Sequence, residues 1–170
     1  MKVLCSILMV VLLLTVSPLA DAQAKRIPKY VVRFNSFGPV KVGMTVTQAS
    51  KALGIRLVTT EQGNCRYFEA KRGFKDIGFM VNDGTIARFD VFERGIATDR
   101  GARVGDSEAR IKSLYKGMYE VSKHPYVDGH YIVVDMKGGK FSIIFETDGK
   151  RVTSFRAGRS PEIGYIEGCS

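Results

Sequence analysis

The sequence is poor in the residues that mark several large classes of protein. Its 170 residues include only 5 prolines and 3 cysteines, and its 18 glycines are too few for a collagen repeat. No heptad pattern persists along the chain, so collagen-like, low-complexity and coiled-coil proteins are excluded. With 45% hydrophobic and 25% charged residues, the composition is typical of a globular protein. The length predicts one compact domain or two small ones.

Motifs for catalysis and cofactor binding are also scarce. The chain has no CxxC pair, no phosphate-binding loop ending in Lys-Ser/Thr and no nucleophile elbow. His130 alternates with apolar residues, which favours a partly buried structural histidine, and His124 precedes a proline in a predicted loop. Ser122, His124 and Asp128 are the residue types of a Ser-His-Asp triad, but no glycine-rich oxyanion segment lies beside a serine there. We therefore predict no catalytic residues, no cofactor and no metal site. A small hydrolase that uses either histidine is the least favoured alternative.

The one long apolar run is too short to cross a bilayer. It covers Val3–Val16, follows a basic residue and precedes two small-x-small patterns, Ala20-Asp21-Ala22 and Ala22-Gln23-Ala24. These features predict a cleaved signal peptide over residues 1–24 and a periplasmic or secreted mature protein. Cys5 lies at the start of the apolar run and not just after it, so it is badly placed for a lipid anchor at the cleavage point.

The charge is strongly basic, with 26 Lys and Arg against 17 Asp and Glu and a net charge of +9. For an exported protein this charge indicates acidic partners such as lipid headgroups, surface polysaccharides or an acidic protein, and no nucleic acid. A basic surface that only aids solubility is an equally good interpretation.

Two cysteines remain in the mature chain, Cys65 and Cys169. In an oxidising compartment they are expected to form one disulfide, which would tie the C-terminus to the first half of the chain. A zinc site would need four ligands, so it would have to use both of these cysteines and both histidines of the chain.

Two segments of the chain resemble each other. Residues 38–54 and 101–117 each contain a Val-Gly pair, then Thr45 or Ser107, and then a short amphipathic stretch that stops at a glycine. The hydroxyl side chains can cap the first free N–H groups of a helix, and a glycine can end one in the left-handed conformation.

A second pair of similar segments follows the first. Residues 79–89 and 145–155 both alternate apolar and polar residues around an Asp-Gly turn, which predicts a hairpin in each. Two motifs that recur in the same order, roughly 65 residues apart, predict an internal duplication.

These patterns predict an α+β fold of two tandem repeats. Each repeat has a short helical segment and an antiparallel meander, and together they form one continuous sheet with helices on one face. The expected strands are residues 66–70, 77–81, 85–91, 130–136, 140–146 and 152–156. The expected organisation is signal peptide 1–24, N-terminal extension 25–37, repeat units 38–94 and 95–160, and a tail 161–170 held by the disulfide.

The motif Val42-Gly43-Met44-Thr45, with its degenerate copy Val104-Gly105-Asp106-Ser107, resembles the superfamily of β-lactamase-inhibitor proteins and SmpA/OmlA (BamE-like) proteins. The resemblance covers about residues 38–155 and implies an exported, non-catalytic protein that binds other proteins. The chain differs from the BamE-like lipoproteins in lacking a lipidated cysteine after the signal. It differs from the inhibitor in having too few cysteines for a disulfide in each unit.

If the helices cover one sheet face, the other face stays open and carries aromatic, Arg and polar groups suited to protein recognition. The candidate partner-binding residues on it are Arg88, Asp90, Tyr131, Asp135, Ser142, Ser154 and Arg156. We therefore expect this face to dock onto an envelope or secreted protein, as an inhibitor, immunity-type or assembly factor. The alternatives are a basic module for anionic glycan or lipid headgroups, and an ordinary solvated sheet face.

Overall fold

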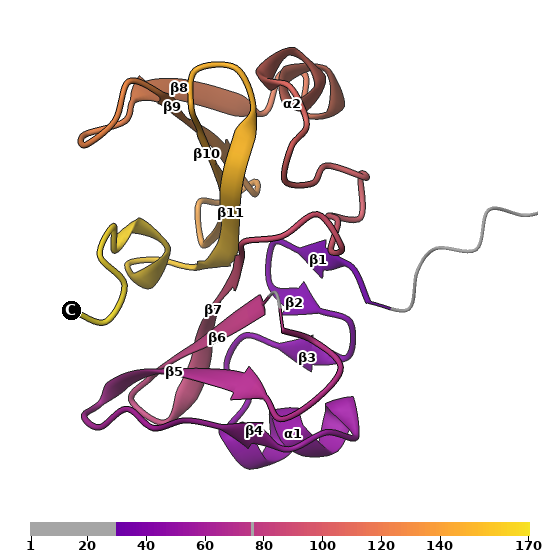
Figure 1. The fold of residues 1–170 in the computed structure, drawn as a ribbon, viewed down its shortest axis with the longest axis vertical. Helices are drawn as coiled ribbons and strands as arrows, with labels where there is room; N and C mark the ends of the chain where they lie inside the picture. Colours follow the sequence, from indigo (N-terminus) through magenta and orange to yellow (C-terminus); the bar gives the residue numbers. More distant parts are fainter. Residues whose placement is uncertain (1–29, 76) are drawn as a thin grey trace, which may run out of the picture.

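The main element of the protein is an eight-stranded antiparallel sheet, seen here in a computed structural model that describes residues 30–75 and 77–170 (Figure 1). The predicted signal peptide, residues 1–24, lies outside the described residues. In spatial order the strands are β4 (Leu57–Val58), β5 (Cys65–Ala70), β6 (Ile77–Asn82), β7 (Thr85–Val91), β11 (Val152–Arg159), β10 (Phe141–Thr147), β9 (His130–Asp135) and β8 (Tyr119–Lys123). The two halves of the chain therefore meet where β7 pairs with β11.

The remaining elements are short. A three-stranded sheet contains β1 (Val32–Arg33), β2 (Ser36–Phe37) and β3 (Val40–Lys41). The helices are α1 (Val46–Leu53), α2 (Glu108–Leu114) and the single 3₁₀ turn η1 (Glu162–Gly164).

The predicted α+β class with helix-on-sheet tandem repeats is wrong, because the protein is mostly β. The described residues form eleven strands and only two α-helices, of 8 and 7 residues. Helices of about two turns cannot cover eight strands, and β1, β2 and β3 supply much of the packing instead. These two-residue strands carry no readable alternation, which is why the sequence pattern did not reveal them.

The sequence predicted the caps and turns more accurately than the fold class. The side chain of Thr45 caps α1 in a full capping box with Gln48, and Gly54 ends the helix at a positive φ of 69°. Asp83 and Gly84 both have positive φ, as the tight turn between β6 and β7 requires. Helix α2 begins after its predicted cap, Ser107, but ends at Leu114, before the predicted stop at Gly117.

The main hydrophobic core lies on one face of the large sheet. There β1–β3, α1 and α2 pack against the sheet through buried side chains such as Phe37, Leu53 and Ile111. Residues 160–170, here called the C-terminal segment, lie on the other face (yellow in Figure 1). Its Ile163 packs in a small second cluster with Tyr131 and Ile144. The C-terminal segment therefore covers part of the face that the sequence analysis expected to be open.

Candidate functional site beneath the C-terminal segment

Buried charged side chains occupy the centre of the face under the C-terminal segment. Arg88 and Asp90 project from β7 and Arg156 from β11, and each is less than a tenth exposed. Asp90 is directly opposite Arg156 across the β7–β11 pair. Strand alternation sends Phe89 and Val91 into the main core and leaves Arg88 and Asp90 on this face. The junction of the two halves thus carries the charged cluster.

Arg88 joins the sheet to the C-terminal segment. Its Nε donates to Asp90 Oδ2 at 3.0 Å, and its Nη1 donates to the backbone carbonyls of Glu162 at 2.8 Å and Tyr165 at 2.7 Å. Its Nη2 donates to the Tyr67 hydroxyl. Each of the three guanidinium nitrogens therefore has a hydrogen-bond acceptor, as burial of a charge requires.

Arg156 makes a second set of contacts to the same segment. Its Nε donates to the Ile163 carbonyl at 2.8 Å, and its Nη1 forms an ion pair with Glu146. Its guanidinium lies 5.2 Å from the centre of the Tyr131 ring, in cation–π geometry. Together the two arginines bind three backbone carbonyls of the C-terminal segment.

Two further ties hold the segment in place. The predicted disulfide between Cys65 and Cys169 is confirmed and links the segment to β5. Glu162 Oε1 accepts hydrogen bonds from Arg159 on β11 and from Asn82 on β6. With the contacts of Arg88 and Arg156, the segment is therefore anchored to four strands of the large sheet, β5, β6, β7 and β11.

Glycines make room for this arrangement. A Cβ at Gly158 would lie 2.5 Å from the Ala87 carbonyl oxygen, so β7 and β11 can approach this closely only with glycine there. A Cβ at Gly78 would lie 3.1 Å from the Tyr67 ring, which packs beside β6.

Burial sets the protonation of the cluster. Burial raises the pKa of Asp90, and the ion pair with Arg88 opposes that rise. Burial also raises the pKa of Tyr67 to about 12, and the negative charge of Asp90 adds to that effect. Tyr67 therefore stays a neutral hydroxyl that accepts from Arg88.

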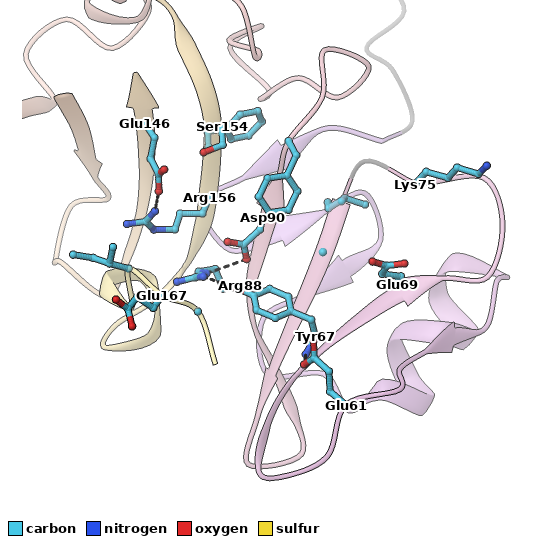
Figure 2. A pocket seen from close by; sticks show the side chains of 16 residues that line it. Glu61, Tyr67, Glu69, Lys75, Arg88, Asp90, Glu146, Ser154, Arg156 and Glu167 are labelled. Atoms are coloured by element: carbon cyan, nitrogen blue, oxygen red, sulfur yellow. Dashed lines mark hydrogen bonds and ion pairs between the residues drawn. The ribbon is translucent and has the colours of Figure 1, made fainter. Parts of the chain in front are cut away.

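A cavity of about 480 Å³ opens between the C-terminal segment and the sheet. Figure 2 shows Arg88, Arg156 and their acidic partners at its floor, with Glu61, Glu69 and Lys75 toward β5 and β6. Ile166, Glu167 and Gly168 form the wall contributed by the C-terminal segment, and Phe92 lies at the rim. We treat this cavity as the candidate functional site.

The structure places the seven predicted partner-binding residues on the same face but does not leave them all open. Arg88, Asp90, Tyr131, Ser142 and Arg156 are buried. Asp135 is exposed and accepts a hydrogen bond from Ser142, and Ser154 is half-buried and lines the cavity. The expectation of an open face fails because the C-terminal segment covers its centre.

Sequence reasoning missed the residues that complete the site. Tyr67, Glu146, Ile166 and Glu167 line the cavity but were not singled out. The predicted disulfide was the signal that could have found them, because Cys169 has to bring its neighbours in the tail to the strand that carries Cys65.

Neither histidine lines the cavity, although His124 Nε2 lies 3.7 Å from Glu146 Oε2 at its edge. His124 is buried, and its Nδ1 accepts hydrogen bonds from the backbone N–H groups of Tyr126 and Val127. His130 Nδ1 lies 2.7 Å from Glu108 Oε1, so it links β9 to the start of α2. Within residues 30–75 and 77–170, no group of three or more His, Cys, Asp or Glu side chains is arranged to hold a metal ion.

Comparison with known proteins supplies a fold relative and no function. No protein-family model matches the chain, and no curated protein matches it significantly. Among solved structures, the chain is similar to the uncharacterized protein YfeY from Escherichia coli, with a TM-score of 0.51 and 19% identity. The match covers 76% of this chain and 99% of that one. At this identity the likeness concerns the fold alone. None of the helices in the described part of the chain has the length and apolar character needed to span a membrane.

Proposed function

We propose that the protein is an exported binding protein that docks onto an envelope or secreted protein through the cavity and its apolar rim. The observation that carries this proposal is a preformed cavity whose floor is fixed by buried ion pairs and whose wall is fixed by a disulfide. The partner would be inhibited, neutralised or assembled by this contact.

The rim has the composition of a protein interface. We define the docking rim as the exposed side chains Phe92 (58% exposed), Tyr126 (65%), Tyr165 (39%) and Ile166 (44%). Phe92 and Ile166 line the cavity, and a neighbouring hollow around Cys169 contains Tyr126, Tyr165 and Ile166. Neighbouring aromatic and aliphatic side chains that remain exposed are typical anchors for a protein partner.

The rigidity of this surface also favours binding. Because Arg88, Arg156 and the disulfide already order the C-terminal segment, a partner that binds there loses little conformational entropy in the receptor. The charged side chains of the cluster are already paired with one another and with the C-terminal segment, so in this proposal they support the rim and do not contact the partner.

The proposal is tested by affinity capture from the producer's envelope extract and culture medium, with mass spectrometry of the retained proteins. The bait is the oxidised mature protein as wild type, Ile166→Asp or Met136→Asp. Met136 is 42% exposed but lies outside the docking rim, so it matches Ile166 in exposure. We expect one protein to be retained by wild type and Met136→Asp and lost with Ile166→Asp. Equal retention by all three baits would refute the docking rim.

The net charge of +9 favours a second candidate, recognition of an anionic glycan or lipid headgroup. Such binding should weaken steeply between 0.05 and 0.3 M salt, since screening shortens the range of each charge. Binding to vesicles with and without anionic lipid tests this candidate. An affinity that does not change with salt concentration would count against it.

A further inference from the structure

We infer that the docking rim receives a loop of a protein partner that places one Lys or Arg side chain in the cavity between apolar neighbours. This inference rests on the proposed function and specifies the chemistry of the partner. It follows from three features of the cavity: the charges of the side chains that line it, the position of the unpaired carboxylate of Glu69, and the apolar side chains around its mouth.

The cavity is acidic although the protein is basic. Five carboxylates line it against three cationic side chains, an excess of two negative charges, whereas the whole chain carries +9. Asp90 and Glu146 are already paired with Arg88 and Arg156. The carboxylates that remain for a ligand are Glu61, Glu69 and Glu167.

These three carboxylates come from opposite walls of the cavity. Glu61 precedes β5 and Glu69 lies on it, whereas Glu167 belongs to the C-terminal segment. Glu167 is oriented by the Tyr126 hydroxyl, which donates to its Oε1 at 3.0 Å. Glu61 accepts from the backbone N–H of Tyr67 at 2.6 Å. The carboxylate of Glu69 is exposed and makes no hydrogen bond or ion pair with any described residue. A cation between the walls would therefore find acceptors on both sides.

The surroundings favour a basic side chain on a protein over a free cation. The Phe92 ring at the mouth can accept cation–π contact, and Ile166 offers apolar area for the methylene stem or a neighbouring side chain. At physiological salt, screening limits the range of an exposed charge to about 8 Å. The nearby carboxylates therefore attract a cation more strongly than the distant positive charges of the protein repel it.

The test uses the oxidised protein and two short peptides, Ac-Leu-Arg-Gly-NH₂ and the same peptide with citrulline, the uncharged isostere of arginine. Binding is followed by ¹H–¹⁵N NMR at the amides of Gly78, Phe92 and Gly168, which surround the cavity. We expect the arginine peptide to shift these amides and to bind about fivefold more tightly than the citrulline peptide, since each exposed ion pair contributes up to about 1 kcal/mol.

Variants localise the effect. Glu69→Gln with Glu167→Gln should lower affinity for the arginine peptide to that of the citrulline peptide. Glu120→Gln, an exposed carboxylate on the outer strand β8, should change nothing. Equal affinity for the two peptides, no shift at the three amides, or equally tight binding of free spermidine would each overturn the inference. If it fails while Ile166→Asp still abolishes capture, the proposed function stands with a partner of different chemistry.

Discussion

Arg88 is a charged side chain in a buried position at the junction of the two halves of the chain. It is buried, yet it balances the charge of Asp90 and donates to two carbonyls of the C-terminal segment. Removing a charge from such a pair leaves the partner buried without compensation, which costs more than the pair itself contributes.

Arg88→Met should therefore lower the free energy of unfolding by about 3–5 kcal/mol, measured by urea denaturation. Arg72→Met, at an exposed arginine, should change it by less than about 0.5 kcal/mol. The double variant Arg88→Met/Asp90→Leu should recover part of the loss because no uncompensated charge remains. A loss below 1 kcal/mol in the single variant would contradict a central role for these contacts.

Glu108 predicts how stability depends on pH. Burial disfavours its charge, but hydrogen bonds from Thr147, His130 and Lys112 outweigh burial and lower its pKa to about 2. Because the folded pKa lies below the unfolded value of 4.5, the stabilisation is present above pH 4.5 and is lost as pH falls toward 2. Urea unfolding of wild type from pH 6 to 2 should show this loss. Glu108→Gln should be less stable at pH 6 and should show a shallower decline, and parallel curves would contradict the assignment.

At the scale of elements, the contact between β7 and β11 joins the two halves of the chain. Their register places Gly158 of β11 opposite Arg88, the residue that holds the C-terminal segment. The sheet can stay continuous at this junction because the backbones approach without a Cβ between them.

Gly158→Ala should destabilise the protein by about 1–3 kcal/mol, because its Cβ would meet backbone atoms that cannot give way. Gly164→Ala is the matched control, since a Cβ there has no atom within 4 Å. The thermal unfolding midpoints of the two variants should therefore differ, with that of Gly158→Ala the lower. An equal, small effect of the two substitutions would mean that β7 and β11 can separate without cost.

At the scale of the molecule, the disulfide connects residues 104 positions apart in the sequence and keeps one wall of the cavity on the sheet. The wall residues Ile166, Glu167 and Gly168 directly precede Cys169. Stability and the binding surface are therefore coupled through one covalent bond.

The Cys65→Ser/Cys169→Ser variant should lose roughly 4–5 kcal/mol of stability, as expected for the release of a loop of about 100 residues. Docking through the rim should fall with it, and hydrogen exchange should increase at the backbone N–H groups of Gly164, Tyr165 and Gly168, whose hydrogen bonds lie within the segment. A reductant should affect wild type and leave the variant unchanged. Full protection of these amides in the variant would show that the arginines alone hold the segment.

The sequence by itself determined the local structure of this protein. Alternation located β5, β6, β7, β9, β10 and β11 and separated Arg88 and Asp90 from the core face, capping residues located the helix starts, and two cysteines predicted the disulfide. The edge strand β8, whose residues are mostly exposed, was missed. The errors concern features with no periodic signal. Strands of two residues are too short to alternate, so the mostly β class was not recognised.

Only the tertiary structure decided that the polar face is covered. Alternation separates two faces of a strand but does not say which neighbour lies on each. The C-terminal segment is held through the backbone carbonyls of Glu162, Ile163 and Tyr165. Every residue has a carbonyl, so these contacts leave no mark in the sequence, and the cavity that they create exists only once the chain has folded.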